Sequence, residues 1–394
     1  MKTLLVLAAA LPLSAQVAVR GGIVHTMAGE PIRDGVVLTR DGRIERVGPA
    51  SSVAIPAGYR TLQAKVVTPG LVDAHSVVGL TGYLNQPHDQ DQTERSTAIQ
   101  PELRAIDAYN PREPLVGYLR TYGITTVHTG HGPGPLVSGQ TLIAKTAGDT
   151  VEQVLVADGV MVAATYGEAA VESGSKSPGS RPKMIAMLRA ELIRAQEAVA
   201  KGTGTSAARD LRQEIFQQLI RRETPLLVTV NRAHDIATVL RLGKEFNLRI
   251  VLDGAAEAHL LIDEIKASGY PVILHPTMAR AGEETENLSM ETASKLKAAG
   301  ILFALQSGYE GYVPKTRVVL LEAAMAAANG LTFRDALASV TIDAARLLGI
   351  DRRVGSIEPG KDADLALYDG DPFEFTTHCT AVVLGGRVVS ETPR

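Results

Sequence analysis

The stretch Val67-Thr-Pro-Gly-Leu-Val-Asp-Ala-His75 decides the fold of this chain. A short apolar run ends at a Pro-Gly turn, and a second apolar run then leads to Asp73 and His75. Residues two apart on a strand point to the same face, so we expect Asp73 and His75 to share a face at a strand end. Two histidines at this spacing can hold a metal ion. The residue two beyond His75 is Val77, however, and its side chain has no donor atom.

Length and composition indicate a globular protein. The chain has 394 residues, 45% of them hydrophobic and 21% charged, which suffices for one large domain and a smaller one. The formal net charge is -3 and the basic residues are scattered, which argues against binding to nucleic acid or to an anionic membrane surface. Cys379 is the only cysteine, so no intrachain disulfide can form, and we interpret it as a small buried apolar residue.

The first 15 residues have the pattern of a signal peptide. Lys2 precedes an apolar run from Leu4 to Leu11, and Leu13-Ser-Ala15 resembles a small-residue cleavage site. The apolar run is too short to span a bilayer, and no later stretch is long and apolar enough to do so. We therefore expect an exported protein, periplasmic or secreted, with no membrane anchor after cleavage of residues 1–15.

Apolar runs of strand length alternate with helical periodicity through the middle of the chain. The runs are Val66–Val72, Ile124–Thr129, Thr141–Ala144, Val160–Ala164, Leu226–Val230, Arg249–Leu252, Pro271–Leu274 and Ile301–Leu305. Buried strands separated by helices are typical of a parallel sheet, and eight of them favour an α/β fold with a closed (β/α)8 TIM-type barrel. An open doubly wound sheet is the alternative, but no glycine-rich phosphate turn follows any of the runs.

The two ends of the chain differ from the middle in their sequence pattern. Both are rich in short β-type segments and turns, such as Asp41-Gly42 near the start and Gly385-Gly386 near the end. We expect residues 16–65 and 354–394 to form a small composite β-sandwich. Residues 66–353 would then form the barrel.

Several segments together resemble the amidohydrolase superfamily, in particular its imidazolonepropionase-like and related exported members. They are Pro69-Gly-Leu-Val-Asp-Ala-His75, Leu103-Arg-Ala-Ile-Asp-Ala-Tyr-Asn-Pro111, Gly123-Ile-Thr-Thr-Val127, Ile342-Asp-Ala-Ala-Arg346 and Val354–Leu365. The resemblance covers nearly all of the chain after residue 15. It implies a metal-dependent barrel hydrolase that acts on amide, cyclic amide or other non-peptide C–N bonds.

The resemblance also implies where metal ligands should lie. The family uses a His-x-His pair on strand one, often a lysine on strand four, a histidine each on strands five and six, and an aspartate on strand eight. At the corresponding positions this chain keeps only His75; the others are Val77, Ala163, Asn231, Gly254 and Gly308 (or its neighbour Ser307). A catalytic zinc site needs about three protein ligands, so we expect the inherited metal site to be degraded.

Other polar residues are expected near the carboxyl ends of the barrel strands, where sites of such barrels lie. The pocket candidates are His75, His88, Asp107, His128, His131, Lys145, Asn231, His275 and Tyr309. Two of them have structural alternatives, since Lys145 could be a surface lysine at a strand end and Asp107 could cap a helix or turn.

Three hypotheses for function stay open. In the first, His75, His128, His131 and His275 form a relocated zinc site. In the second, a histidine acts as general base in metal-free hydrolysis, with Lys145 or Tyr309 polarising a carbonyl. In the third, the protein is a non-catalytic exported barrel that binds a small-molecule ligand or a partner. We expect no cofactor unless the first holds, and either a homo-oligomer or a pair with a paralogue; the sequence does not identify the substrate.

Overall fold

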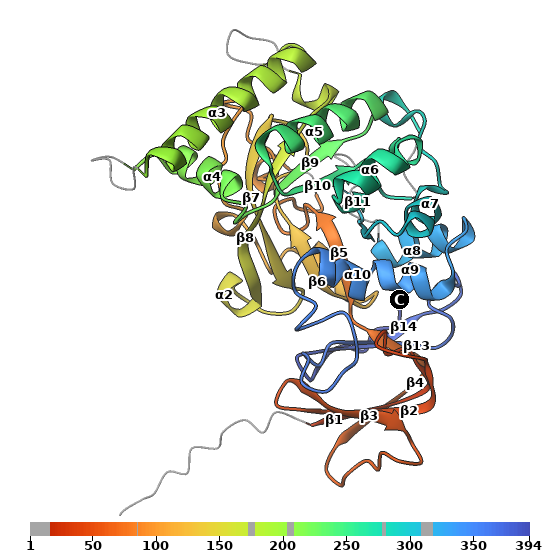
Figure 1. The fold of residues 1–394 in the computed structure, drawn as a ribbon. Coiled ribbons are helices and arrows are strands. Elements are labelled where there is room, and N and C mark those ends of the chain that lie inside the picture. The colour runs from red at the N-terminus through yellow and green to blue at the C-terminus, as the bar shows by residue number, and fades with distance from the viewer. Residues whose placement is uncertain (1–15, 85, 172–177, 203–208, 278–280, 309–317) are drawn as a thin grey trace, which may run out of the picture.

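The computed structural model describes residues 16–84, 86–171, 178–202, 209–277, 281–308 and 318–394. Figure 1 shows a large unit covered by helices and, below it, a smaller unit of strands that contains both ends of the described chain. The expected fold class is confirmed: an α/β barrel is joined to a smaller β unit made from both termini. The signal peptide expected over residues 1–15 lies outside the described residues.

The smaller unit is a seven-stranded sheet in the order β15-β14-β13-β4-β1-β2-β3. Its strands are β1 (Val17–Val24), β2 (Ile32–Arg40), β3 (Arg43–Pro49), β4 (Arg60–Pro69), β13 (Leu365–Tyr368), β14 (Cys379–Leu384) and β15 (Arg387–Ser390). Asp41 and Gly42 join β2 to β3 with φ angles of 50° and 78°, the left-handed geometry of a tight hairpin turn. β4 pairs with β1 on one side and with β13 on the other, so this sheet holds the two ends of the chain together.

The larger unit is built on an eight-stranded sheet in the order β12-β11-β10-β9-β8-β7-β6-β5. Its strands are β5 (Leu71–Ser76), β6 (Ile124–Thr129), β7 (Val137–Lys145), β8 (Leu155–Thr165), β9 (Leu226–Val230), β10 (Ile250–Gly254), β11 (Val272–Leu274) and β12 (Phe303–Leu305). A bridge between Ser76 and Gly308 brings the first and last strands together, so the sheet curves into a nearly closed barrel. The expected run Val66–Val72 is divided at Gly70, because β4 belongs to the terminal sheet and β5 to the barrel.

β7 differs from the expected arrangement because it is antiparallel to both of its neighbours. Only residues 130–136 connect β6 to β7, and this is too short for the helical crossover that two parallel strands need. The carboxyl end of β7 therefore lies at the opposite end of the barrel from the carboxyl ends of the other strands.

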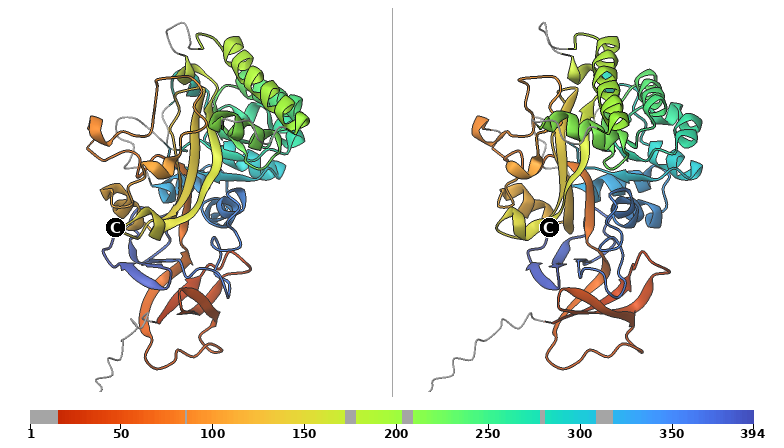
Figure 2. Two further views of the ribbon diagram at one scale, coloured as in Figure 1. Left: turned by 90° about the vertical axis from the view of Figure 1, so that its left-hand side faces the viewer. Right: turned by 60° about the vertical axis from the view of Figure 1, so that its left-hand side comes forward.

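The helices lie around the outside of the barrel (Figure 2). They are α1 (Pro114–Arg120), α2 (Val151–Val154), α3 (Arg181–Lys201), α4 (Leu211–Ile220), α5 (Ala233–Phe246), α6 (Ile262–Ser268), α7 (Thr292–Ala299), α8 (Val319–Ala328), α9 (Phe333–Ser339) and α10 (Ile342–Leu347). Short 3-10 helices are η1 (Pro87–Asp89), η2 (Ala105–Asp107), η3 (Glu168–Ala170), η4 (Ala258–Leu260) and η5 (Glu283–Thr285). No helix in the described ranges is long and apolar enough to cross a membrane.

The interior of the barrel is a packed apolar core. One buried side chain from nearly every strand contributes to it, and these are Val72, Ile143, Met161, Leu227, Val251, Ile273 and Ala304. Residues of α10 and the segment after it pack against the same cluster. Polar side chains that follow these core residues along the strands therefore pack against a rigid apolar core that excludes water.

Candidate functional site

A network of polar side chains lies next to the apolar core, toward the carboxyl ends of the parallel strands. We call it the polar layer, and its members are His75, His128, Thr141, Thr229, Asp253 and Gln306. None of the six is more than 8% exposed, so each depends on the others for hydrogen bonds.

Asp253 is the centre of the polar layer. Its Oδ1 accepts from Nδ1 of His75 at 3.0 Å and from Nε2 of Gln306 at 2.9 Å, and its Oδ2 accepts from the Thr229 hydroxyl at 2.6 Å. Burial alone would raise the pKa of Asp253, but the neighbouring His75 and these hydrogen bonds outweigh burial and hold the pKa below its ordinary value. Asp253 is thus held as a carboxylate by three protein donors.

His128 lies beside His75, with the ring centroids 5.6 Å apart. Its Nδ1 is 2.6 Å from the Ala74 carbonyl oxygen, which can only accept, so Nδ1 carries the proton. Its Nε2 then accepts from the Thr141 hydroxyl at 2.7 Å. Burial, followed by the proximity of His75, lowers the pKa of His128 to about 3. The imidazole is therefore neutral, and both of its nitrogens are already used.

Asp73 forms a second buried pair, with Ser307 from the loop after β12. One carboxylate oxygen accepts from the Ser307 backbone N–H at 3.1 Å, and the other accepts from the Ser307 hydroxyl. Asp73 is fully buried, and burial raises its pKa to about 6 despite these hydrogen bonds and the nearby His75. This carboxyl therefore titrates close to neutral pH.

His131 and His275 are also buried, at 7% and 3% exposure. Nδ1 of His275 donates to the Pro276 carbonyl oxygen at 2.7 Å, which leaves Nε2 as an acceptor, and no described residue donates to it. Neither ring nitrogen of His131 has a hydrogen-bond partner within the described ranges. Burial lowers the pKa of both residues, that of His131 to about 4, so both imidazoles are neutral.

A pocket of about 310 Å³ lies where β8 and β9 end, and we call it the mouth pocket. Its lining residues are Pro133, Thr165, Glu168, Ala169, Thr229, Asn231, Gly282, Glu283, Glu284 and Thr285. Thr229 belongs to both the mouth pocket and the polar layer, so it links the two. Glu284 is paired with Arg181 at 2.5 Å and also accepts from the Glu168 backbone N–H.

Several predicted site residues lie outside the polar layer. His88 and Asp107 are exposed on the 3-10 helices η1 and η2. Asn231 lines the mouth pocket, and its backbone carbonyl accepts from the Glu257 N–H. Tyr309 lies outside the described residues.

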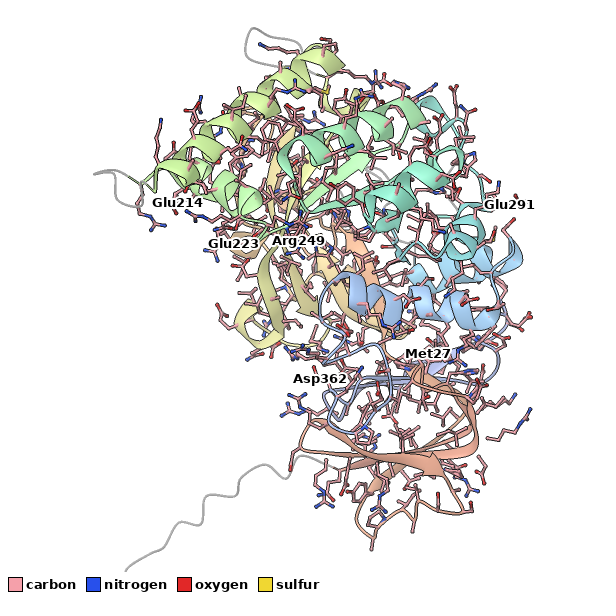
Figure 3. The ribbon with its side chains drawn as sticks, in the orientation of Figure 1. Met27, Glu214, Glu223, Arg249, Glu291 and Asp362 are labelled. Carbon is pink, nitrogen blue, oxygen red and sulfur yellow. The ribbon has the colours of Figure 1, made fainter. Side chains whose placement is uncertain are left out.

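Lys145 lies at the other end of the barrel, because it ends the antiparallel strand β7. Its ammonium group contacts Asp364 and lies 3.3 Å from Asp362, two carboxylates of the segment that leads into the terminal sheet. Figure 3 labels Asp362 at the seam between the barrel and that sheet. Placing Lys145 among the pocket candidates was therefore wrong, as was the idea that it polarises a carbonyl at the mouth.

The residues present do not fit the divalent metal that the family resemblance implies. Val77 and Ala163 are buried aliphatic side chains, and Gly254 and Gly308 have no side chain at all, with φ angles of 76° and 82°. Across the described ranges, no three His, Cys, Asp or Glu side chains converge so that they could hold a metal ion. The four histidines of the relocated-site hypothesis thus gain no support, and His75 is hydrogen-bonded to Asp253 instead.

Sequence reasoning missed Asp253, Gln306 and Thr229 as members of the site. Each lies at or just beyond the end of an apolar strand, where a polar residue in a buried run is itself a signal. Asp253 immediately precedes Gly254, the position at which the family resemblance implies a histidine, so the polar residue of this strand end is shifted by one position.

Comparison with known proteins agrees with the fold. The family model described as "Amidohydrolase family" matches residues 229–390. The imidazolonepropionase of Rhizorhabdus wittichii is 25% identical over 374 residues, which cover 87% of this chain and 91% of that protein. The imidazolonepropionase of Stenotrophomonas maltophilia is 26% identical, with 92% of each chain covered. The amidohydrolase tasK of Hapsidospora irregularis is 26% identical, but the match spans only 38% of its length.

Among solved structures, an amidohydrolase from Thermotoga maritima MSB8 superimposes with a TM-score of 0.88 at 26% sequence identity. The superposition covers 95% of this chain and 100% of that one, so both the barrel and the terminal sheet are shared. Fold, sequence relatives and the matching family model lead to one conclusion: the chain belongs to the amidohydrolase superfamily of hydrolases and is imidazolonepropionase-like.

Proposed function

We propose that this protein binds a small molecule at the mouth of its barrel and that the metal-dependent hydrolysis of its superfamily is lost. The observation that carries the proposal is the hydrogen bonding of the polar layer. Asp253 accepts from His75, Thr229 and Gln306, and both nitrogens of His128 are used within the protein. Because Asp253 and His128 already make these hydrogen bonds within the protein, a divalent ion would have to displace them in order to bind there.

Buried acceptors that follow β11 and β12, together with the acidic lining of the mouth pocket, support a ligand that donates hydrogen bonds from nitrogen. Nε2 of His275 and Oε1 of Gln306 are buried acceptors without a partner in the described part of the chain, and each costs about 1–3 kcal/mol unless a donor reaches it. Continuing the register of β11 and β12, in which Leu274 pairs with Leu305, makes these two residues neighbours. The exposed Glu168 and Glu283 add negative charge to the mouth pocket, whose volume of about 310 Å³ suits a small ligand.

Metal content tests the loss of the metal site. We expect substoichiometric zinc after the purified protein is dialysed first against zinc and then against buffer. About one zinc per chain that is lost in His75→Ala and retained in the exposed control His88→Ala would overturn the proposal.

Titration with small ligands tests the second part of the proposal, the binding of a small molecule at the mouth pocket. We expect benzamidine and small alkylammonium ions to bind with saturation in NMR titrations, whereas benzoate does not bind. Asn231→Leu should weaken binding at the mouth pocket, and Asp107→Leu, at an exposed position, should leave it unchanged. Equal binding of benzoate and benzamidine would contradict the assignment.

A second candidate is metal-independent hydrolysis of a non-peptide C–N bond, and it is favoured by Asp73. A carboxyl with a pKa of about 6 suits general acid–base catalysis near neutral pH. A panel of N-acyl amino acids, dipeptides and cyclic amides assayed with a chelator tests it. Chelator-resistant turnover that disappears in Asp73→Asn would establish this candidate, whereas no turnover across the panel leaves ligand binding.

We further propose that the chain is exported and that it forms a homo-oligomer or pairs with a paralogue. Sequencing the amino terminus of protein recovered outside the cytoplasm tests the expected cleavage after Ala15. Light scattering on the purified protein, alone and with a co-expressed paralogue, tests the assembly.

A further inference from the structure

A second pocket, of about 440 Å³, lies far from the mouth, and we call it the distal pocket. It is formed by α1 with the segment before it, the turn after β7, and β15 of the terminal sheet. Its lining residues are Pro111, Arg112, Glu113, Pro114, Gly117, Arg120, Ala147, Gly148, Asp149 and Val389. Because the turn after β7 lies at the end of the barrel opposite the mouth, the distal pocket is separate from the site described above.

Arg120 is the unusual residue of the distal pocket. Its guanidinium group is half-buried, and its Nη1 donates to the Thr146 carbonyl oxygen at 2.5 Å. Its Nε is fully buried and has no hydrogen-bond partner among the residues that the structure describes. Burial lowers the pKa of Arg120, and within the described residues no carboxylate acts on it. A guanidinium group has five N–H donors, and in the described residues only one of them donates to a protein acceptor.

The two carboxylates that line the same pocket form hydrogen bonds or ion pairs with groups other than Arg120. Asp149 pairs with Arg112 at 3.0 Å, and both are exposed. Glu113 is buried, and its two oxygens accept from the backbone N–H groups of Leu115 at 2.6 Å and Tyr83 at 3.1 Å. Neither acid pairs with Arg120 in the part of the chain that the structure describes, so N–H donors of its guanidinium group stay available, although the charges of Arg112, Glu113, Arg120 and Asp149 sum to zero.

Other arginines of the chain have the carboxylate partner that Arg120 does not have in the described residues. Arg181 pairs with Asp235 and Arg189 with Glu245, and those carboxylates raise the pKa of each arginine. The position of Arg120 at the end of α1 does not explain why its pKa is lowered while those of Arg181 and Arg189 are raised. The carbonyl groups at that end accept from the backbone N–H of Thr121, whereas the guanidinium group reaches across to another segment.

We propose that the distal pocket binds a small oxyanion, a carboxylate or a phosphate, on the guanidinium group of Arg120. The planar fork of an arginine matches two oxygens of either group, and a partly desolvated arginine binds them more strongly than an exposed one. Val389 of β15 lines the same pocket, so a bound oxyanion lies at the seam between the barrel and the terminal sheet. Binding there stabilises the folded chain through mass action.

Calorimetric and thermal-melting titrations with sodium phosphate and sodium acetate, at constant ionic strength set by chloride, test this proposal. For the wild type we expect saturable binding of at least one of the two anions and a matching rise in melting temperature. Arg120→Gln should lower the affinity at least tenfold. Arg189→Gln, which removes an exposed arginine of α3, should leave it unchanged.

Arg120→Lys provides a second measurement if Arg120→Gln does not fold. It keeps the positive charge but loses the planar fork, so the affinity should fall without loss of the folded state. Saturable binding that is equal in wild type, Arg120→Gln and Arg120→Lys would overturn the proposal, as would an effect of both anions that never saturates. These results do not depend on whether the mouth binds a ligand.

Discussion

Replacing Asp73 with asparagine tests whether the barrel interior is as dry as the hydrogen bonding implies. Asp73 is fully buried, and its pKa rises from 3.8 to about 6 on folding, mainly because of burial. The folded state therefore prefers the protonated carboxyl. The penalty for the ionised form is absent below the unfolded pKa, grows between the two values and is complete above the folded one. About two pKa units correspond to about 3 kcal/mol of unfolding free energy.

Asparagine reproduces the neutral form at every pH. Its amide oxygen can accept from the Ser307 backbone N–H, and its amide nitrogen can donate to the Ser307 hydroxyl. We therefore expect the stability of Asp73→Asn, relative to wild type, to increase by about 2 kcal/mol from about pH 4 to about pH 7.5. Urea unfolding followed by circular dichroism at several pH values measures this difference. The exposed Asp107→Asn serves as the control and should show no such pH dependence.

The opposite slope would refute the reasoning. If wild type gains stability over Asp73→Asn as the pH rises, then the two hydrogen bonds from Ser307 outweigh burial and Asp73 is ionised at neutral pH. A second carboxylate, in addition to Asp253, would then lie close to His75, and the two negative charges together would favour a bound cation. A flat difference would mean that water reaches the carboxyl and keeps its pKa near the ordinary value.

Three further measurements examine other parts of the argument. Asp253→Ala removes the acceptor of three buried donors and should lower the unfolding free energy by about 3–5 kcal/mol in urea titrations, whereas Asp107→Ala should stay within about 0.5 kcal/mol of wild type. Lys145→Met leaves two buried carboxylates with less compensation and should cost about 3 kcal/mol in the same assay, against no measurable change for the exposed Lys183→Met. Nitrogen NMR of His128 should show the Nδ1–H tautomer without titration between about pH 5 and about pH 8, and a shift to the charged form in that range would contradict its assignment.

The strands of the barrel could be predicted because each is a compact apolar run. The run expected at Leu226–Val230 is β9, and the run expected at Ile124–Thr129 is β6. Burial on both faces removes the polar alternation of an exposed strand, and that signal is local. The direction of β7 is not local, since it depends on the connection before it, and the seven residues 130–136 already excluded a parallel crossover. With β7 taken as parallel, Lys145 was expected at the mouth of the barrel, whereas the antiparallel direction of β7 puts it at the opposite end.

The candidate site was predictable only in part for a similar reason. His75 and His128 could be assigned to strand ends from the sequence, and the structure brings their rings together. Their hydrogen-bond partners come from other strands, and which side chains meet depends on the register and closure of the whole barrel. Asp253 is 178 residues from His75 along the chain, so no local pattern could pair them.

Charge compensation explains why the hydrogen bonds of the polar layer converge on Asp253. A carboxylate as buried as Asp253 is tolerated only with a counter-charge or with several donors, because an unpaired charge in a dry interior is very costly. In a metal site the ion supplies that compensation, whereas here His75, Thr229 and Gln306 supply it as hydrogen bonds. These donors and a divalent cation would compete for the same oxygens. A single change that restores one lost ligand, such as a histidine in place of Val77, therefore leaves Asp253 and His75 bound to each other, and recovering a metal site requires rebuilding the layer as a unit.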